Sequence, residues 1–148
     1  MNKSQTTVMV GADGSDNSVK AVKAAAELAE RFDIERILAI HVIAPSVIPD
    51  GGESAGMHLQ VVKAMEDRAD QIVQSTEKHL AEADLDCVVE TEILHGDPGL
   101  ELVEKATEEQ VDYVVVGSRG NTGMARFLLG SVSERVVRNA PCSVMVVR

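Results

Sequence analysis

The feature that most constrains the fold of this sequence is an alternation of short apolar runs with amphipathic segments. The run at 36–44 is rich in Ile and Val and continuously apolar, which is typical of a parallel strand buried on both faces. Between such runs, apolar residues such as Val19, Val22 and Ala26 recur at helical spacing. The pattern predicts strands at 6–12, 36–44, 86–94, 112–116 and 142–147, and helices at 15–31, 58–83, 97–109 and 132–140. This order predicts an α/β fold with helices on both faces of a parallel sheet.

Length and composition exclude several classes of protein. The 148 residues contain no internal repeat, so we expect one domain spanning 1–148. The net charge is −10 and aromatic residues make up 2%, which argues against nucleic-acid or anionic-membrane partners. No apolar run approaches the ~20 residues that span a bilayer, and the N-terminus lacks a signal-peptide core. We therefore expect a cytoplasmic location.

A glycine-rich segment follows the fourth apolar run and leads into the last amphipathic segment. Its spacing is Gly117-x2-Gly120-x9-Gly130-Ser131, which is neither a Walker A motif nor the G-x-G-x-x-G of dinucleotide folds. Glycines let a ligand approach the backbone closely, and a helix N-terminus offers unpaired N–H groups and positive dipole. Together they predict a phosphate-binding loop. Ser131-Val-Ser-Glu134 also fits a capping box that begins the last helix.

This spacing resembles the ATP-binding signature of the universal stress protein family. The resemblance extends over the chain through Val10-Gly-Ala-Asp13-Gly-Ser15, His41-Val42, His95-Gly-Asp-Pro98 and the ending Ala140-Pro-Cys-Ser-Val-Met-Val-Val-Arg148. It implies an ATP-binding stress-response or signalling module that acts as a nucleotide-regulated dimer.

The resemblance, together with right-handed crossovers, favours a Rossmann-like, doubly wound sheet of five strands in the order 3-2-1-4-5. Ligands bind such sheets beyond the carboxyl ends of the strands where the order reverses. Here that point lies between the first and fourth strands, which are followed by Asp13 and Gly117. Two segments about 100 residues apart should therefore meet at one crevice.

The resemblance also implies roles for individual residues. The backbone at Val42 would meet the adenine edge, and Asp13 would lie near the ribose and the phosphate-bound metal ion. The cofactor would be ATP or another adenine nucleotide with Mg²⁺ or Mn²⁺. The predicted contacts are Ala12, Asp13, Val42, Gly117, Arg119, Gly120, Gly130, Ser131, Val132 and Ser133.

Other interpretations of the same residues remain open. Asp13 could be only a turn residue, and Ser131 could be only a helix cap. His41 and His95, near strand ends, fit backbone hydrogen bonding better than catalysis, and no catalytic residue is predicted. Alternative functions are a slow ATPase or phosphotransferase, a dimeric interaction protein, or a domain like the nucleotide-alpha-hydrolases or electron-transfer flavoproteins.

The two predicted edge strands differ in charge. The third carries Asp86, Glu90 and Glu92, whereas the fifth, 142–147, has no charge and no proline. An apolar edge invites pairing, so we expect a homodimer through the C-terminal strand by two-fold symmetry; a monomer with a shielded edge is the alternative.

The two cysteines, Cys87 and Cys142, lack metal-site spacing and are expected to be small buried thiols within strands. On opposite edges of this sheet they would be separated by roughly 19 Å, too far for a disulfide.

Overall fold

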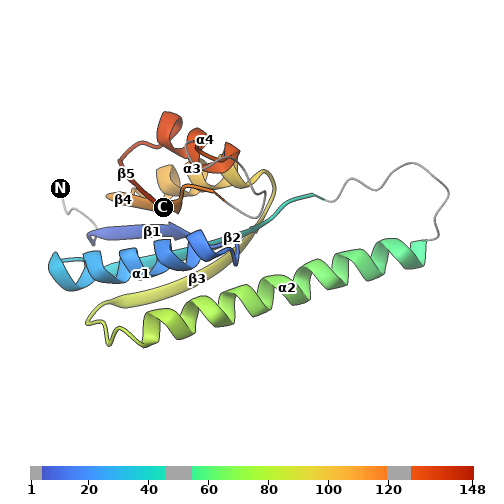
Figure 1. Ribbon diagram of the computed structural model, residues 1–148, viewed down its shortest axis with the longest axis horizontal. Coiled ribbons are helices and arrows are strands. Elements are labelled where there is room, and N and C mark those ends of the chain that lie inside the picture. The colour runs from blue at the N-terminus through green and yellow to red at the C-terminus, as the bar shows by residue number, and fades with distance from the viewer. Residues whose placement is uncertain (1–4, 46–54, 120–127) are drawn as a thin grey trace.

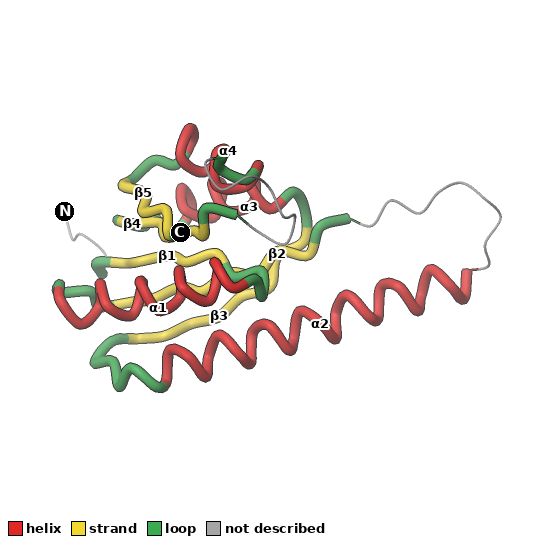
Figure 2. Tube along the Cα trace, viewed as in Figure 1, coloured by secondary structure: helices red, strands yellow, loops and turns green. Residues whose placement is uncertain are grey.

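A computed structural model describes residues 5–45, 55–119 and 128–148. Strands and helices alternate along these residues (Figures 1 and 2). The elements are β1 (Thr7–Gly11), α1 (Asp16–Arg31), β2 (Arg36–Ile43), α2 (Ala55–Ala81), β3 (Val88–His95), α3 (Pro98–Glu108), β4 (Tyr113–Gly117), α4 (Ser131–Asn139) and β5 (Ser143–Val147). The predicted order of elements is confirmed.

The five strands form one parallel sheet in the order β3-β2-β1-β4-β5, as predicted. The central strand β1 places Val8 opposite Ile37 of β2 on one side and Tyr113 of β4 on the other. The chain builds outward from β1 to β2 and β3, and then returns to add β4 and β5. The reversal of strand order therefore lies between β1 and β4.

Alternate residues of the central strands point to opposite faces of the sheet, and both faces are buried. Val8 and Val10 belong to an apolar cluster with α1 and α2. Met9, between them, belongs to a second cluster with Leu102 of α3 and Val136 of α4. Figure 2 shows α1 and α2 on one side of the sheet and α3 and α4 on the other. The continuous apolar runs follow from this double burial.

Polar side chains cap two of the helices, whereas the capping box predicted for the last helix is wrong. Ser15 caps α1 by accepting from the Ser18 amide at 3.2 Å, and Asp97 caps α3 in front of Pro98. The predicted capping box at Ser131 does not form, because Gly130 is the N-cap of α4 and makes no side-chain cap bond. Ser131 is instead the first helical residue.

Several boundaries differ from the predicted ones. β3 begins at Val88, whose amide donates to the Glu35 carbonyl at 2.9 Å. Cys87 and Cys142 therefore precede their strands rather than lying within them. The helix α2 begins at Ala55 and extends beyond the end of the sheet (Figure 1). Its outer part leaves Leu59 68% exposed, so this turn is helical without burying an apolar face.

Both cysteines are free thiols at opposite edges of the sheet, as predicted, but each is half-buried rather than buried. Burial is the main cause that raises the pKa of the Cys87 thiol, and Asp86 adds to it. Burial likewise raises the pKa of Cys142, with a smaller contribution from Asp112. Both thiols are thus less reactive than an ordinary exposed cysteine.

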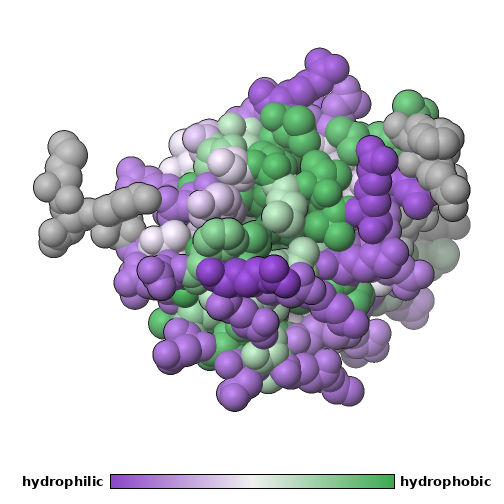
Figure 3. All heavy atoms as spheres, turned by 60° about the vertical axis from the view of Figure 1, so that its left-hand side comes forward, coloured by the Kyte–Doolittle hydropathy of each residue, from purple (hydrophilic) through white to green (hydrophobic). Residues whose placement is uncertain are grey.

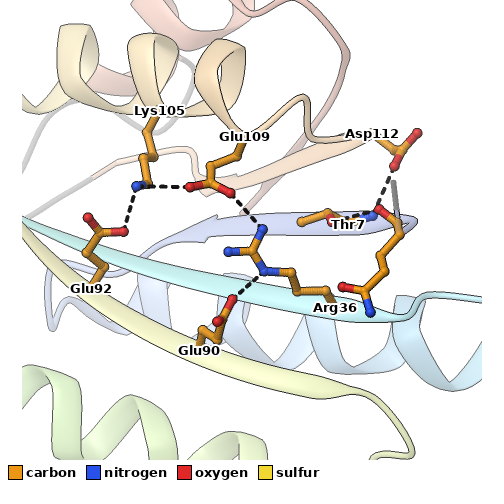
Figure 4. A network of polar contacts seen from close by, with 8 residues as sticks. Thr7, Arg36, Glu90, Glu92, Lys105, Glu109 and Asp112 are labelled. Carbon is orange, nitrogen blue, oxygen red and sulfur yellow. Dashed lines mark hydrogen bonds and ion pairs between the residues drawn. The ribbon is translucent and has the colours of Figure 1, made fainter. Parts of the chain in front are cut away.

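Charged residues form a network near the amino ends of β2 and β3 (Figure 4). The Arg36 guanidinium bonds Glu109 at 2.8 Å and also pairs with Glu90. Lys105 lies 2.8 Å from Glu92 and 3.2 Å from Glu109. Hydrogen bonds from Arg36 and then Lys105 lower the pKa of Glu109. The hydrogen bond to Glu109 raises the pKa of Arg36, and the bond to Glu92, followed by the one to Glu109, raises the pKa of Lys105. Burial opposes both changes.

None of the helices in the described ranges combines the length and the apolar character that crossing a membrane requires.

Candidate functional site

A cavity of about 400 Å³ lies beyond the carboxyl ends of β1, β2 and β4. It is lined by Gly11, Ala12, Asp13, Ser18, Ile40, His41, Val42, Ala44, Pro98, Leu102, Val116, Gly117, Arg119, Gly130, Ser131, Val132 and Ser133. Nine of the ten residues predicted to contact nucleotide are among them. The tenth, Gly120, lies outside the described residues. The structure therefore brings the first, second and fourth strand ends together at the predicted crevice.

Gly117, the last residue of β4, is a glycine for a reason internal to the fold. A Cβ atom added there would lie 2.9 Å from the carbonyl carbon of Asn17 and 3.0 Å from its oxygen. Asn17 belongs to the first turn of α1, whose backbone cannot give way locally. This glycine therefore allows α1 to pack against the end of β4, in addition to lining the cavity.

Gly130 is different, because none of the described residues around it requires a glycine. Its φ is −67°, which any residue can adopt. A Cβ atom at this position would lie 3.5 Å from the nearest atoms, in ordinary van der Waals contact with Arg119 and Ser118. The described residues therefore leave room for a Cβ atom at the N-terminus of α4, beside the cavity.

The first turn of α4 turns backbone donors toward the same cavity. Its first internal bond runs from the Glu134 amide to the Gly130 carbonyl at 2.9 Å. The amides of Ser131, Val132 and Ser133 precede it and have no carbonyl to bond within the helix. Ser131 is exposed, while Ser133 is 2% exposed. Amides at the positive end of a helix suit an anion.

Ser133 donates its hydroxyl hydrogen to backbone carbonyls rather than presenting it to the cavity. Its Oγ lies 3.0 Å from the Ser118 oxygen and 3.0 Å from the Gly130 oxygen. The Ser118 oxygen also accepts from the Gly130 amide at 2.7 Å. We call Ser118, Gly130 and Ser133 the β4–α4 junction, since they join the end of the strand to the start of the helix.

Asp13 occupies the turn between β1 and α1. Its Oδ1 accepts from the Ser15 amide at 2.9 Å, and its own amide donates to the Ser18 hydroxyl oxygen at 3.3 Å. Gly14 has a φ of +82°, which the tight turn requires. These contacts agree with the interpretation of Asp13 as a turn residue. The side chain also lines the cavity.

His41, in β2, bonds to the backbone as expected. Its Nδ1 lies 2.7 Å from the Ala12 carbonyl oxygen. Because a carbonyl can only accept, Nδ1 carries the hydrogen. The ring thus ties the end of β2 to the segment after β1, and it lines the cavity beside Val42.

An apolar wall of the cavity was missed by the sequence analysis. Its members share positions at strand ends or on the first turns of α3: Ile40, Ala44, Pro98, Leu102 and Val116. Part of the signal lies in the helical spacing of Leu102 and Ala106, which indicates the buried face of this helix. Its position over the strand ends depends on how α3 crosses the sheet.

Among the described residues, no group of three or more His, Cys, Asp or Glu side chains is arranged to hold a metal ion. Asp13 supplies the carboxylate found in the described cavity lining. A magnesium ion commonly uses one or two carboxylates together with waters and substrate phosphates. The cavity therefore fits a metal ion that arrives with a phosphorylated ligand, rather than one held by protein alone.

Comparison with known proteins agrees with this architecture. A universal stress protein of Methanocaldococcus jannaschii is 38% identical over 95% of this chain and 81% of its own length. The solved universal stress protein UspA from Lactobacillus plantarum superposes with a TM-score of 0.83 at 23% identity, covering 99% of this chain and 100% of that one.

A solved universal stress protein in complex with cAMP has a TM-score of 0.73 at 28% identity, over 97% of both chains. The family model described as the universal stress protein family matches residues 5–148. By fold, sequence identity and family match, this chain belongs to the universal stress protein family.

Proposed function

We propose that this protein binds an adenine nucleotide in the cavity beyond β1 and β4. The observation that carries the proposal is the convergence of nine predicted contact residues, from three separate parts of the chain, on one cavity. The cAMP complex of a relative 28% identical to this chain supports the choice of an adenine nucleotide.

The two ends of the cavity favour different parts of the ligand. Ile40, Val42 and Leu102 give an apolar wall at the end of β2 and α3, which suits a base. Gly117, Gly130 and the first amides of α4 lie at the other side, where donors and positive dipole suit phosphate. Arg119 lines this side and adds positive charge to an otherwise acidic protein.

ATP with Mg²⁺ or Mn²⁺ is the proposed cofactor. The ion would bind the phosphate oxygens, waters and the Asp13 carboxylate, whose Oδ1 already accepts from Ser15. Rapid phosphoryl transfer needs a group that positions or activates the attacking nucleophile. Since Asp13 is engaged in its turn, we propose a binding and signalling role rather than fast turnover.

Calorimetry with ATP, AMP and cAMP, each with and without Mg²⁺, tests the proposal. We expect saturable binding of at least one of them, with Mg²⁺ strengthening ATP binding in particular. Absence of heat and of any thermal shift up to millimolar ligand would refute nucleotide binding. Single-turnover hydrolysis with Mg²⁺ would separate a binding module from a slow ATPase.

We further propose a cytoplasmic homodimer paired through β5. This strand ends the sheet and pairs with β4 on one side. Figure 3 brings forward the side where β4 and β5 lie in Figure 1, and an apolar area ringed by hydrophilic side chains occupies it. Met145 of β5 is 40% exposed. A second β5 would cover this edge by two-fold symmetry.

The strand geometry supplies a sharp test of the dimer. Val147 turns its carbonyl toward β4, where it accepts from Ser118 at 2.7 Å, so the backbone groups of Val146 point to the open edge. Val146→Pro removes a hydrogen-bond donor there, whereas Val146→Thr keeps it. By light scattering at tens of micromolar, we expect the threonine variant to remain a dimer and the proline variant to become a monomer. A monomeric wild type, or a proline variant that dimerises unchanged, would refute pairing through β5.

A further inference from the structure

The β4–α4 junction is made entirely by protein atoms around one carbonyl. The Ser118 oxygen accepts from the Gly130 amide at 2.7 Å and from the Ser133 hydroxyl at 3.0 Å. A carbonyl oxygen has two lone pairs, so both of its hydrogen-bonding positions are used. Ser118 and Ser133 are 5% and 2% exposed. The junction is therefore shielded from water. If one of its hydrogen bonds is removed, the partner left behind is buried and unsatisfied, which costs the full desolvation penalty of that group.

Ser118 is itself held by elements on either side. Its amide donates to the Val147 carbonyl at 2.7 Å, and its hydroxyl receives a bond from the Asn17 side chain at 3.3 Å. These contacts fix Ser118 to β5 and to α1. Whatever bonds to the Ser118 carbonyl is therefore positioned against the frame of the sheet.

The Ser133 hydroxyl has one hydrogen, which is shared between the carbonyls of Ser118 and Gly130. The side chain is buried, so this donor is not presented to a ligand in the cavity. Its bonds instead tie the first turn of α4 to the end of β4. The amides of that turn are the donors that the proposed nucleotide site depends on.

We propose that Ser133 is a positioning residue of the nucleotide site and not a phosphate contact. Its hydroxyl sets the direction in which the N-terminus of α4 faces the cavity, by bonding the fixed carbonyl of Ser118. The inference rests on the proposed nucleotide binding for its effect on affinity, but the hydrogen bond itself can be tested without a ligand.

A matched pair of variants tests the role of the hydroxyl. Threonine and valine have nearly the same shape, and only threonine keeps the hydroxyl that Ser133 uses. The first measurement is amide hydrogen exchange of Gly130 in ligand-free protein, since its N–H shares the Ser118 carbonyl. The second is the affinity for ATP with Mg²⁺, measured by calorimetry. If the larger side chains prevent folding, both measurements are made on Ser133→Ala instead.

The positioning role predicts a change in both measurements. We expect Ser133→Val to speed exchange of the Gly130 amide and to weaken ATP binding about fivefold to tenfold, the worth of one hydrogen bond. Ser133→Thr should restore both to near the wild-type values. Nucleotide should slow Gly130 exchange in the threonine variant more than in the valine variant.

Other results would overturn the inference. If Ser133→Val weakened binding while leaving Gly130 exchange in ligand-free protein unchanged, the hydroxyl would be a direct ligand contact. Equal behaviour of the threonine and valine variants would show that the hydroxyl has no role. If wild-type protein bound no nucleotide, the proposed function would fail, and the exchange measurement alone would still decide whether Ser133 holds the junction.

Discussion

The two ends of the sheet differ in the chemical groups that lie there. At the amino end, side chains of opposite charge pair across β2, β3 and α3, with Arg36 between Glu90 and Glu109 (Figure 4). At the carboxyl end, the cavity is bordered by glycines and by the first backbone amides of α4. The charged side chains at the amino end pair with one another, whereas the first amides of α4, at the carboxyl end, have no hydrogen-bond partner within their helix.

This difference separates groups that stabilise the fold from groups that are available to a ligand. A charged network whose members are 14% to 49% exposed contributes modestly to stability. The first amides of α4 and the missing side chain of Gly130 contribute little to stability, but they make space and positive potential where an anion can approach. At the amino end of the sheet the charged groups are therefore paired within the protein, whereas at the carboxyl end the backbone donors are available to a ligand.

The largest expected effect lies at Gly117, which belongs to both fold and site. Gly117→Ala places a Cβ atom 2.9 Å from the backbone of Asn17, so α1 must shift. We expect a loss of about 2–3 kcal/mol in the free energy of unfolding, measured by urea denaturation. A variant of wild-type stability would show that this glycine serves only the ligand.

Gly130→Val tests the second glycine, which packing against the described residues does not require, in contrast to Gly117. A Cβ atom fits here without clashing with the described residues, so we expect the free energy of unfolding to fall by no more than about 1 kcal/mol, the cost of a poorer N-cap residue. The valine side chain would occupy the space proposed for phosphate, and we expect ATP affinity measured by calorimetry to fall at least about thirtyfold. Unchanged affinity would exclude Gly130 from the site.

Glu109→Gln tests the amino end. The bonds from Arg36 and Lys105 lower the pKa of Glu109 in the folded state, so its contribution to stability is present above the unfolded pKa and is lost as the pH falls through the folded value. We expect the variant to be less stable by about 1 kcal/mol at pH 7, with the difference shrinking as the pH falls below the ordinary glutamate range, by chemical denaturation. Glu108→Gln, at an exposed neighbour in α3, is the control. A difference that did not shrink on acidification would rule out this charge effect, and ATP affinity should not change.

The smallest effect is expected at the cysteines. Cys87 and Cys142 are free and flank opposite edges of the sheet, so a reducing agent should leave the melting temperature unchanged. Thiol titration of denatured, unreduced protein should find both. An intrachain bridge between them would contradict the strand order.

The sequence analysis predicted the alternation of elements, the strand order and nine of the seventeen residues that line the cavity. The alternation follows from apolar periodicity, because periodicity follows burial. The strand order and the contact residues rested on the family resemblance, and the place of the crevice on the rule that ligands bind where the strand order reverses. The prediction failed at the start of α4, where Ser131-x-x-Glu134 matches a capping box. In the structure Ser133 bonds inward to Ser118 and Gly130, and Gly130 takes the cap position.

By itself, the sequence determined which segments form strands, which form helices and where the glycines lie, because these depend on local pattern. The tertiary structure decided which glycine serves the fold and which leaves room for a ligand. That distinction depends on Asn17, distant in sequence, which approaches Gly117 but not Gly130. It also decided that the Ser133 hydroxyl is used inside the protein, because hydrogen bonds are assigned by which carbonyl lies within reach after folding.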